Sequence, residues 1–182
     1  MEAMGHSNIF LVGMMGAGKT TVGRALATRM KREFVDTDRL LVDRTGVAVA
    51  IVFEIEGEEG FRRRESAILR EVCEQDERVV ATGGGIVLAE ENLQVMRESG
   101  TVVYLRARLE SLWERTRHDS SRPLLATPNP RERLSELLTQ REPLYRAAAH
   151  IVVDSGPQSA ATLVNRVLAA LRARSAGAAS AS

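Results

Sequence analysis

Gly13-Met14-Met15-Gly16-Ala17-Gly18-Lys19-Thr20 matches the P-loop pattern G-x-x-x-x-G-K-[ST] over its full length. A short apolar run, residues 9–12, precedes this stretch and is typical of a β-strand. Apolar residues then recur at helical spacing, at Val22, Leu26 and Met30. The sequence therefore predicts a loop that joins a strand to a helix, which is the context in which this pattern binds phosphate groups.

The backbone and the side chains of this loop both indicate nucleotide chemistry. The N–H groups of Gly16, Ala17 and Gly18 can converge on phosphate oxygens, since glycine lets the backbone turn without a Cβ clash. Lys19 would place a cation at the β- and γ-phosphates, and Thr20 would offer a hydroxyl to Mg²⁺. The alternative is a glycine turn before an ordinary helix, and the flanking strand and helix argue against it.

The composition is that of an ordinary globular protein. The chain has 182 residues, of which 44% are hydrophobic and 27% charged, with a formal net charge of +1. This balance allows one domain with a substantial core, and it argues against a protein that coats a polyanion. Cys73 is the only cysteine, so no internal disulfide can form, and we expect it to be a small core residue.

The sequence indicates neither a membrane span nor a secretory route. No apolar run approaches about 20 residues, the length that spans a bilayer. The N-terminus lacks a basic segment followed by an apolar stretch, which is the pattern of a signal peptide. We therefore expect a cytoplasmic protein without a membrane or nucleic-acid partner, and we expect it to be a monomer.

Short apolar runs alternate with helical patterns along the chain. We expect strands at residues 9–12, 33–36, 79–81, 101–105 and 150–153, with helices between them. Such alternation predicts an α/β fold with a parallel sheet and helices on both faces. We expect a single domain at residues 1–174, followed by a disordered tail at 175–182 that has nothing to bury.

A long polar and proline-rich segment, about residues 118–130, breaks this alternation. It lies between two helical stretches, and a connection of this length in a compact domain is often a lid or a binding loop. The alternative is an inert surface loop. Arg122 lies within the segment, which favours a lid over phosphate groups.

Two carboxylates, Asp36 and Asp38, lie where the second strand ends. In an extended chain, residues two apart point the same way, so both would face the crevice at the carboxyl end of the sheet. One could serve Mg²⁺ through water, and the other could accept a hydroxyl proton. The equally weighted alternative is that Asp38 caps the helix that follows, and the two interpretations are compatible.

Several arginines could contribute to a site. Arg62, Arg63 and Arg64 fan around a helix that opens at Gly57, so at most two of them can face one site. The default interpretation is a solvated helix face with i,i+4 ion pairs. Arg141 lies late in another helical stretch, where it indicates only a surface charge.

Gly83, Gly84 and Gly85 follow the third strand. Three glycines in a row carry an entropic cost that a plain turn would not require. They indicate close approach of the backbone to a ligand, with peptide N–H groups as donors. A bare turn is the alternative.

Taken together, these motifs resemble those of the shikimate kinase family. The members of this family are P-loop kinases of the nucleoside-monophosphate-kinase type. The resemblance extends from Asn8 to the last helix. The segments that carry it are residues 13–20, Asp36-Thr37-Asp38, Gly57-Glu58-Glu59-Gly60-Phe61-Arg62, Gly83-Gly84-Gly85, Arg122-Pro123-Leu124-Leu125 and Arg141-Glu142-Pro143-Leu144-Tyr145. It implies a three-layer P-loop kinase fold, with a five-stranded parallel sheet in the order 2-3-1-4-5 and a mobile lid.

The resemblance also implies a reaction and the residues that perform it. Members of this family transfer the γ-phosphoryl group of ATP to the 3-hydroxyl of shikimate, on the route to chorismate and the aromatic amino acids. The implied catalytic residues are Lys19, Asp38 and Arg122, and those for Mg²⁺ are Thr20 and Asp36. The implied substrate-binding residues are Asp38, Arg62, Gly83, Gly84, Gly85 and Arg141. The implied nucleotide-binding residues are Gly16, Ala17, Gly18, Lys19, Thr20, Thr21, Arg115, Arg122 and Gln158.

Within this implied site, Arg62 and Arg141 would clamp the shikimate carboxylate, and Asp38 would hold the reacting hydroxyl and take its proton. Arg122 would reach the phosphates when the lid closes. Adenine would lie between Arg115 and the loop after the last strand, at residues 154–158.

Two residues depart from the family pattern. Ala48 stands where the family more often has a serine, and Ile51 stands where it more often has an acidic residue. The first change removes an expected helix cap, and the second places an apolar side chain on a usually polar face. We expect these changes to affect the local helix and not the chemistry.

Three other functions fit part of the pattern. A gluconate-kinase-like enzyme is the nearest, although two arginines on one carboxylate and the triple glycine favour shikimate. A GTP-dependent switch would carry an Asn-Lys-x-Asp motif, which the sequence lacks. A binding module that has lost its activity is disfavoured because Lys19, Asp38, Arg62, Arg122 and Arg141 are all present.

Overall fold

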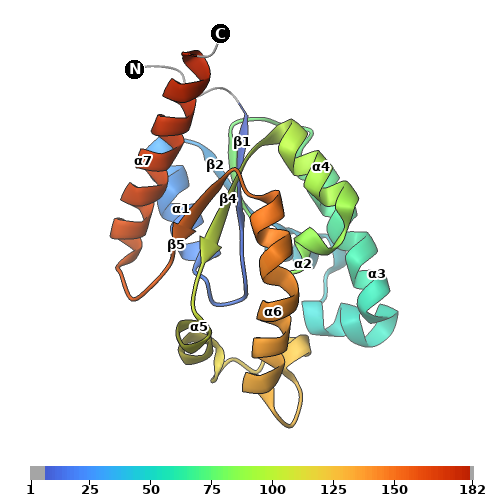
Figure 1. Ribbon diagram of the computed structural model, residues 1–182. Coiled ribbons are helices and arrows are strands. Elements are labelled where there is room, and N and C mark those ends of the chain that lie inside the picture. The colour runs from blue at the N-terminus through green and yellow to red at the C-terminus, as the bar shows by residue number, and fades with distance from the viewer. Residues whose placement is uncertain (1–6, 181–182) are drawn as a thin grey trace.

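The computed structural model describes residues 7–180 of the chain. Its centre is a five-stranded parallel sheet in the order β2-β3-β1-β4-β5 (Figure 1). The strands are β1 (Asn8–Val12), β2 (Glu33–Asp36), β3 (Arg78–Ala81), β4 (Gly100–Arg106) and β5 (Ile151–Asp154). The predicted strands are confirmed to within one residue at each end, and so is the strand order.

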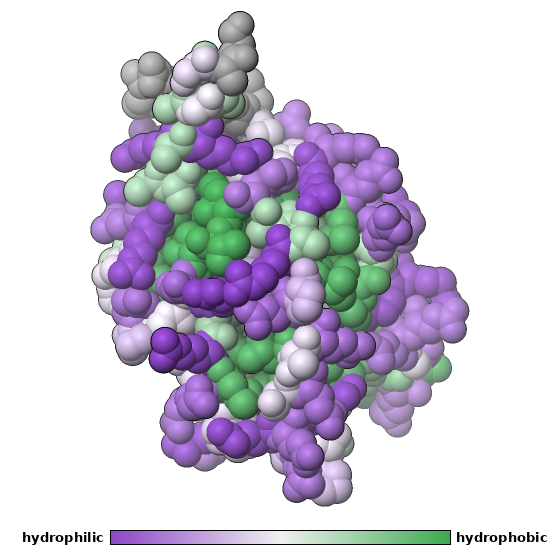
Figure 2. Space-filling model, in the orientation of Figure 1, coloured by the Kyte–Doolittle hydropathy of each residue, from purple (hydrophilic) through white to green (hydrophobic). Residues whose placement is uncertain are grey.

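Helices cover both faces of this sheet (Figure 1). On one face α1 (Lys19–Met30) packs against α7 (Ala160–Ala179), and on the other α4 (Glu90–Ser99) and α6 (Pro130–Ala148) lie over β4. Strand β1 is therefore buried along its whole length, which explains why it is almost wholly apolar. Hydrophilic side chains cover most of the face drawn in Figure 2, and apolar ones show in patches between them.

The remaining elements include helices that begin beyond the carboxyl ends of β2 and β4, and one long helix, at residues 49–72, that runs back to the amino end of β3. They are α2 (Thr37–Thr45), α3 (Val49–Val72), α5 (Leu109–Thr116) and two short 3₁₀ turns, Ile86–Leu88 and Pro123–Leu125. Gly57 interrupts α3, because its φ of +70° belongs to the left-handed region that favours glycine. The predicted helix start at Gly57 thus coincides with a real break in the helix.

The two departures from the family pattern lie at the start of α3. Ala48 precedes the first turn of α3, and its side chain makes no capping hydrogen bond. Ile51 is 38% exposed on this helix, and Ile55, one turn later, is 75% exposed. The helix forms without this cap, and the expectation that the two residues leave the chemistry unchanged stays a prediction.

The predicted disordered tail is wrong for residues 175–179, which continue α7 as far as Ala179. This segment is rich in alanine, the strongest helix former, and extending an existing helix needs no new nucleus. Ser175 and Ala178 also border a small cavity with Ile9, at the amino end of the sheet. Residues 181–182 of the predicted tail, and residues 1–6 of the predicted domain, lie outside the described part of the chain.

Cys73 is half-buried and packs against the core, as its pattern predicted. Burial raises the pKa of its thiol, which makes it less reactive. Among the helices of residues 7–180, none combines the length and the apolar character that crossing a bilayer requires.

His150 links β5 to β4 and should make stability depend on pH. Its Nδ1 atom accepts a hydrogen bond from the backbone N–H of Val102, 3.0 Å away. Burial lowers the pKa of this imidazole, and Arg174 and Arg97 lower it further. The unfolded chain therefore takes up the proton first, at a pKa of about 6.5. The free energy of unfolding should therefore fall as the pH drops below about 6.5 towards the lower pKa of the folded protein. Above about pH 6.5, the contribution of His150 to the free energy of unfolding should be constant.

Urea unfolding of the wild type and His150→Gln between about pH 5 and pH 8 would test this expectation. The variant should lose the part of the acid-side decline that His150 causes. Identical pH dependences in the two proteins would contradict it.

Candidate active site

A cavity of about 500 Å³ opens at the carboxyl end of the sheet. It is bounded by the P-loop, α2, α3, the glycine stretch, the lid segment and α6. Its polar lining residues include Asp38, Arg62, Glu65, Gly83, Gly84, Gly85, Arg122 and Arg141. The structure therefore brings together all six residues that were expected to bind substrate.

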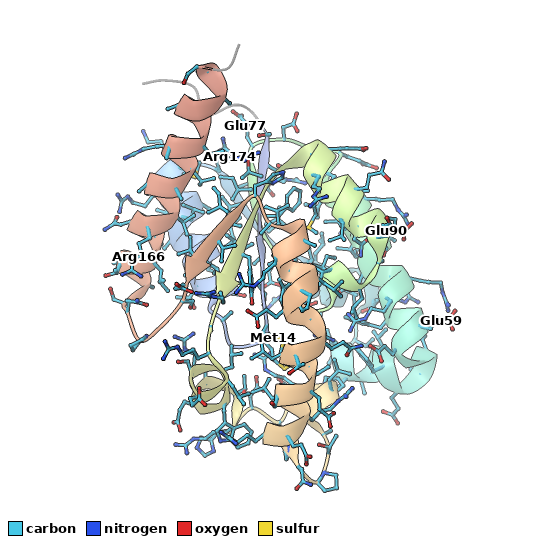
Figure 3. All side chains as sticks on the ribbon, in the orientation of Figure 1. Met14, Glu59, Glu77, Glu90, Arg166 and Arg174 are labelled. Carbon is cyan, nitrogen blue, oxygen red and sulfur yellow. The ribbon has the colours of Figure 1, made fainter. Side chains whose placement is uncertain are left out.

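The P-loop turns from β1 into α1 beside this cavity. Gly16 and Gly18 have φ values of +81° and +93°, which explains why glycine stands at both positions. The Lys19 ammonium donates hydrogen bonds to the carbonyl oxygens of Gly13, at 2.7 Å, and Met14, at 2.9 Å. Met14 lies near the centre of the molecule (Figure 3). The two hydrogen bonds thus hold the Lys19 ammonium against the P-loop, where a bound phosphate would meet its charge.

Burial lowers the pKa of Lys19 to about 8, because the ammonium loses hydration, although Asp38 acts in the opposite direction. Asp38 itself is half-buried, and its pKa is raised, first by burial and then by the nearby Asp36 carboxylate. Lys19, Arg122 and Arg62 oppose that rise. These four charged groups therefore act on one carboxylate in a poorly hydrated site.

Thr20 and Asp36 form the expected pair of oxygen donors. The Thr20 hydroxyl donates a hydrogen bond of 2.8 Å to Asp36 Oδ2. The other carboxylate oxygen, Oδ1, accepts from the backbone N–H groups of Asp38 and Arg39. Asp36 is therefore the cap of α2, and the alternative that Asp38 caps this helix is wrong. Asp38 lies in the first turn of α2, so helical and not extended backbone brings it to the crevice.

A divalent metal would have few protein ligands here. Residues 7–180 contain no cluster of three or more His, Cys, Asp or Glu side chains suited to a metal. Hard oxygen donors such as Thr20 and Asp36 do fit Mg²⁺, which keeps several waters and binds through one or two protein groups and substrate phosphates.

Each of the three glycines makes room for a different charged side chain. A Cβ atom on Gly83 would lie 2.6 Å from Glu65 Oε2 and 2.9 Å from Asp38 Oδ1. A Cβ atom on Gly84 would lie 3.3 Å from Arg141 Nη1, and one on Gly85 would overlap the Arg62 guanidinium. The close approach seen at these glycines is therefore to side chains of the site, and the predicted approach to a ligand stays a prediction.

One of the three consecutive arginines of α3 faces the cavity. Arg62 is 19% exposed and pairs with Glu65 at 2.9 Å and with Glu58 at 3.3 Å. Arg63 is 68% exposed and pairs with Glu59, which projects away from the body of the molecule (Figure 3). Arg64 pairs across the helix break with Glu56. The default of a solvated, paired face thus holds for Arg63 and Arg64 only.

Glu65 is a site residue that the sequence reasoning missed. Its side chain is 2% exposed, and its Oε2 atom has no hydrogen-bond partner. Burial raises the pKa of this carboxyl, and Arg62 opposes the rise. Its position in the helix could have predicted this burial, because Glu65 lies on the same helix face as the buried Ile68 and Val72.

Arg141 is buried, with 2% of its surface exposed, so the surface charge indicated by the residues alone is wrong. It makes no ion pair with any residue in the described part of the chain, and its Nε atom has no hydrogen-bond partner. One helical turn later, Tyr145 donates a hydrogen bond of 2.5 Å to the Gly84 carbonyl. Glu65 interacts with Arg141 electrostatically without forming an ion pair, so this buried guanidinium is a candidate receptor for an anion.

Arg115 joins the P-loop to the loop at 154–158. Its Nη1 donates to the Gly16 carbonyl and its Nη2 to the Gly156 carbonyl, both at 2.9 Å. The Gln158 side chain accepts a hydrogen bond from the backbone N–H of Gly156, within its own loop. Gln158 borders a second cavity, of about 970 Å³, whose lining includes neither the P-loop nor Arg115. Its role at adenine, like that of the exposed Thr21, stays a prediction.

The family model for shikimate kinase matches residues 15–172. The chain belongs to the shikimate kinase family. A shikimate kinase from Nitrosospira multiformis is 59% identical over 152 residues, which are 84% of this chain and 78% of that protein. The expected family, and with it an enzyme that is a kinase, is therefore confirmed.

Solved structures agree with this assignment. A shikimate kinase from Acinetobacter baumannii in complex with shikimate has a TM-score of 0.90 and 42% identity, covering 92% of this chain and 94% of that one. A gluconokinase from Sinorhizobium meliloti 1021 has a TM-score of 0.62 and 20% identity, covering 97% of this chain and 98% of that one. The second likeness shows the fold alone, so the comparisons favour the shikimate kinase family over the gluconate alternative.

Proposed function

We propose that this member of the shikimate kinase family transfers the γ-phosphoryl group of ATP to the 3-hydroxyl of shikimate, with Lys19, Asp38 and Arg122 as its catalytic residues. The observation that carries the proposal is the position of Arg141. This buried cation without an ion-pair partner borders the same cavity as Arg62 and Asp38. The cavity thus offers Arg62 and Arg141 for a carboxylate and Asp38 for a hydroxyl.

The nucleotide would bind along the P-loop and the start of α1. Backbone N–H groups of the loop and the positive end of the helix would hold the phosphates. Lys19 would exchange its two carbonyl partners for phosphate oxygens, which are stronger acceptors. Arg115 would border the adenine, since it already spans the P-loop and the 154–158 loop.

Thr20 and Asp36 would hold Mg²⁺, which when bound would neutralise phosphate charge. Lys19 and Arg122 would add their own charge around the group being transferred. Asp38 would hold the 3-hydroxyl in line and accept its proton. Because phosphoryl transfer depends on positioning and electrostatics, this arrangement needs no covalent intermediate on the protein.

The lid segment would complete the site. Arg122 lies next to Pro123, at the edge of the cavity. Closure would bring it over the phosphates and exclude water, so that ATP is not hydrolysed without a substrate. We also propose that the enzyme works as a monomer in the cytoplasm. Light scattering that gives the mass of two chains would contradict the monomer.

The proposed clamp of Arg62 and Arg141 predicts that the enzyme distinguishes shikimate from its methyl ester. Wild-type enzyme should use shikimate methyl ester far less efficiently than shikimate, because the ester removes a charged acceptor from Arg62 and Arg141. A hydrogen bond to a charged group contributes about 1.5–3 kcal/mol, or about 10- to 100-fold in kcat/KM. Arg62→Ala and Arg141→Ala should each lose much of the preference for the acid. The measurement is kcat/KM for acid and ester on each protein.

Arg63→Ala is the matched control, because it removes the neighbouring, exposed arginine of the same helix. It should keep the full preference for the acid. Lysine should rescue Arg141 poorly, since an ammonium lacks the planar fork. Equal use of acid and ester by the wild type would refute the clamp, as would full preference in both alanine variants.

A further inference from the structure

The lid contains an ion pair that the mechanism above does not use. Asp119 Oδ2 lies 2.9 Å from Arg122 Nε, and the two side chains are 33% and 35% exposed. The Nε atom is shielded from solvent and makes no well-aligned hydrogen bond, so the contact is an ion pair. Among residues 7–180, Asp119 is the one carboxylate that pairs with Arg122.

Asp119 is itself fixed by the turn that follows it. Its Oδ1 atom accepts hydrogen bonds from the backbone N–H of Ser121, at 3.0 Å, and from the Ser121 hydroxyl, at 2.5 Å. These two hydrogen bonds hold the pKa of the Asp119 carboxyl below its usual range, and the bond from the hydroxyl has the larger effect. One carboxylate oxygen thus anchors the residue, while the other contacts the arginine.

Apart from this ion pair, the Arg122 guanidinium has no charged partner within ion-pair distance among residues 7–180. Arg122 lines the cavity beside Asp38, and its charge lowers the pKa of both Lys19 and Asp38. A guanidinium carries five N–H donors. Contact at Nε leaves the four donors on the two Nη atoms for phosphate oxygens.

We propose that Asp119 is a positioning residue that orients the Arg122 guanidinium towards the phosphoryl group being transferred. This inference rests on the proposed role of Arg122. A free arginine would lose side-chain entropy when it is ordered, and an anchored one has already lost part of it. The orientation also matters for rate, because a misplacement of about 1 Å can cost on the order of 10²-fold.

The test is Asp119→Asn, which keeps an oxygen acceptor for Ser121 and removes the charge opposite Arg122. We expect kcat to fall on the order of 10-fold, with the KM for shikimate and for ATP near wild type. In the Arg122→Ala background, Asp119→Asn should cause no further loss, because the group that it positions is absent. Melting temperatures of all variants show whether each one folds.

Glu114→Gln is the matched control, because Glu114 and Arg117 form an ion pair of similar spacing, i,i+3, just before the lid. It should leave kcat unchanged. Wild-type or higher kcat in Asp119→Asn would overturn the inference, and so would an equal loss in the Arg122→Ala background. Full activity of Arg122→Ala would instead refute the proposed role of Arg122, which separates the two failures.

Discussion

Asp38→Asn is expected to lower kcat by about 10²–10⁴-fold, with little change in the affinity for ATP. The amide cannot take the hydroxyl proton, and it also removes the negative charge that orients the hydroxyl. The carboxylate faces the cavity from the first turn of α2. Steady-state kinetics and equilibrium binding of ATP would separate the two effects.

The pH profile adds a second readout for Asp38. Burial and Asp36 raise the pKa of this carboxyl, and its ionised form is the base. Wild-type kcat/KM should therefore fall as the pH drops through that raised pKa, and the residual activity of Asp38→Asn should lack this limb. Asp43→Asn on the exposed side of the same helix is the control. A loss confined to ATP affinity would move Asp38 to the metal site.

Lys19→Met is expected to lower kcat by about 10²–10³-fold in a protein that still folds. Methionine keeps the length of the side chain and removes the cation that would stabilise charge on the phosphates. Folding should survive because the lysine makes only two hydrogen bonds, both within the P-loop. The measurements are turnover in a coupled assay and the melting temperature.

The chain offers a direct control, since Lys31 is the only other lysine. It lies at the end of α1, remote from the P-loop in sequence, so Lys31→Met should keep wild-type turnover. Near-normal turnover by a well-folded Lys19→Met protein would remove the P-loop lysine from the mechanism.

The fold could be predicted from the sequence because its signals are local. Parallel strands buried on both faces are short apolar runs, and the P-loop fixes where one strand ends and the next helix begins. The tail at 175–179 shows the limit of composition. An alanine-rich segment has little to bury, yet it adds turns to a helix that is already anchored.

The site could be predicted less completely than the fold, because the burial of a charged side chain depends on residues far away in sequence. Arg141 looks like any surface arginine until α6 places it against Gly84. Glu65 looks like half of an i,i+3 ion pair, and only the folded chain shows that Gly83 leaves space for it. Only the resemblance to the family pointed to Arg141, and only the structure showed that Glu65 belongs to the site. Asp36 and Asp38 could be selected from the sequence, but which of them caps α2 depends on where the helix begins.

The glycine stretch has a consequence for inhibitors and for the resistance that they select. At Gly83, Gly84 and Gly85, any added side chain meets a charged group of the site, and it is a different group at each position. A mutation that blocks a compound there would also displace Asp38, Arg141 or Arg62. The same cavity has an apolar wall at the start of α3, which Val49 and Ala50 form without any charged group of the site. Compounds that bind the peptide groups of this stretch should therefore select resistant variants less readily than compounds that rely on the wall.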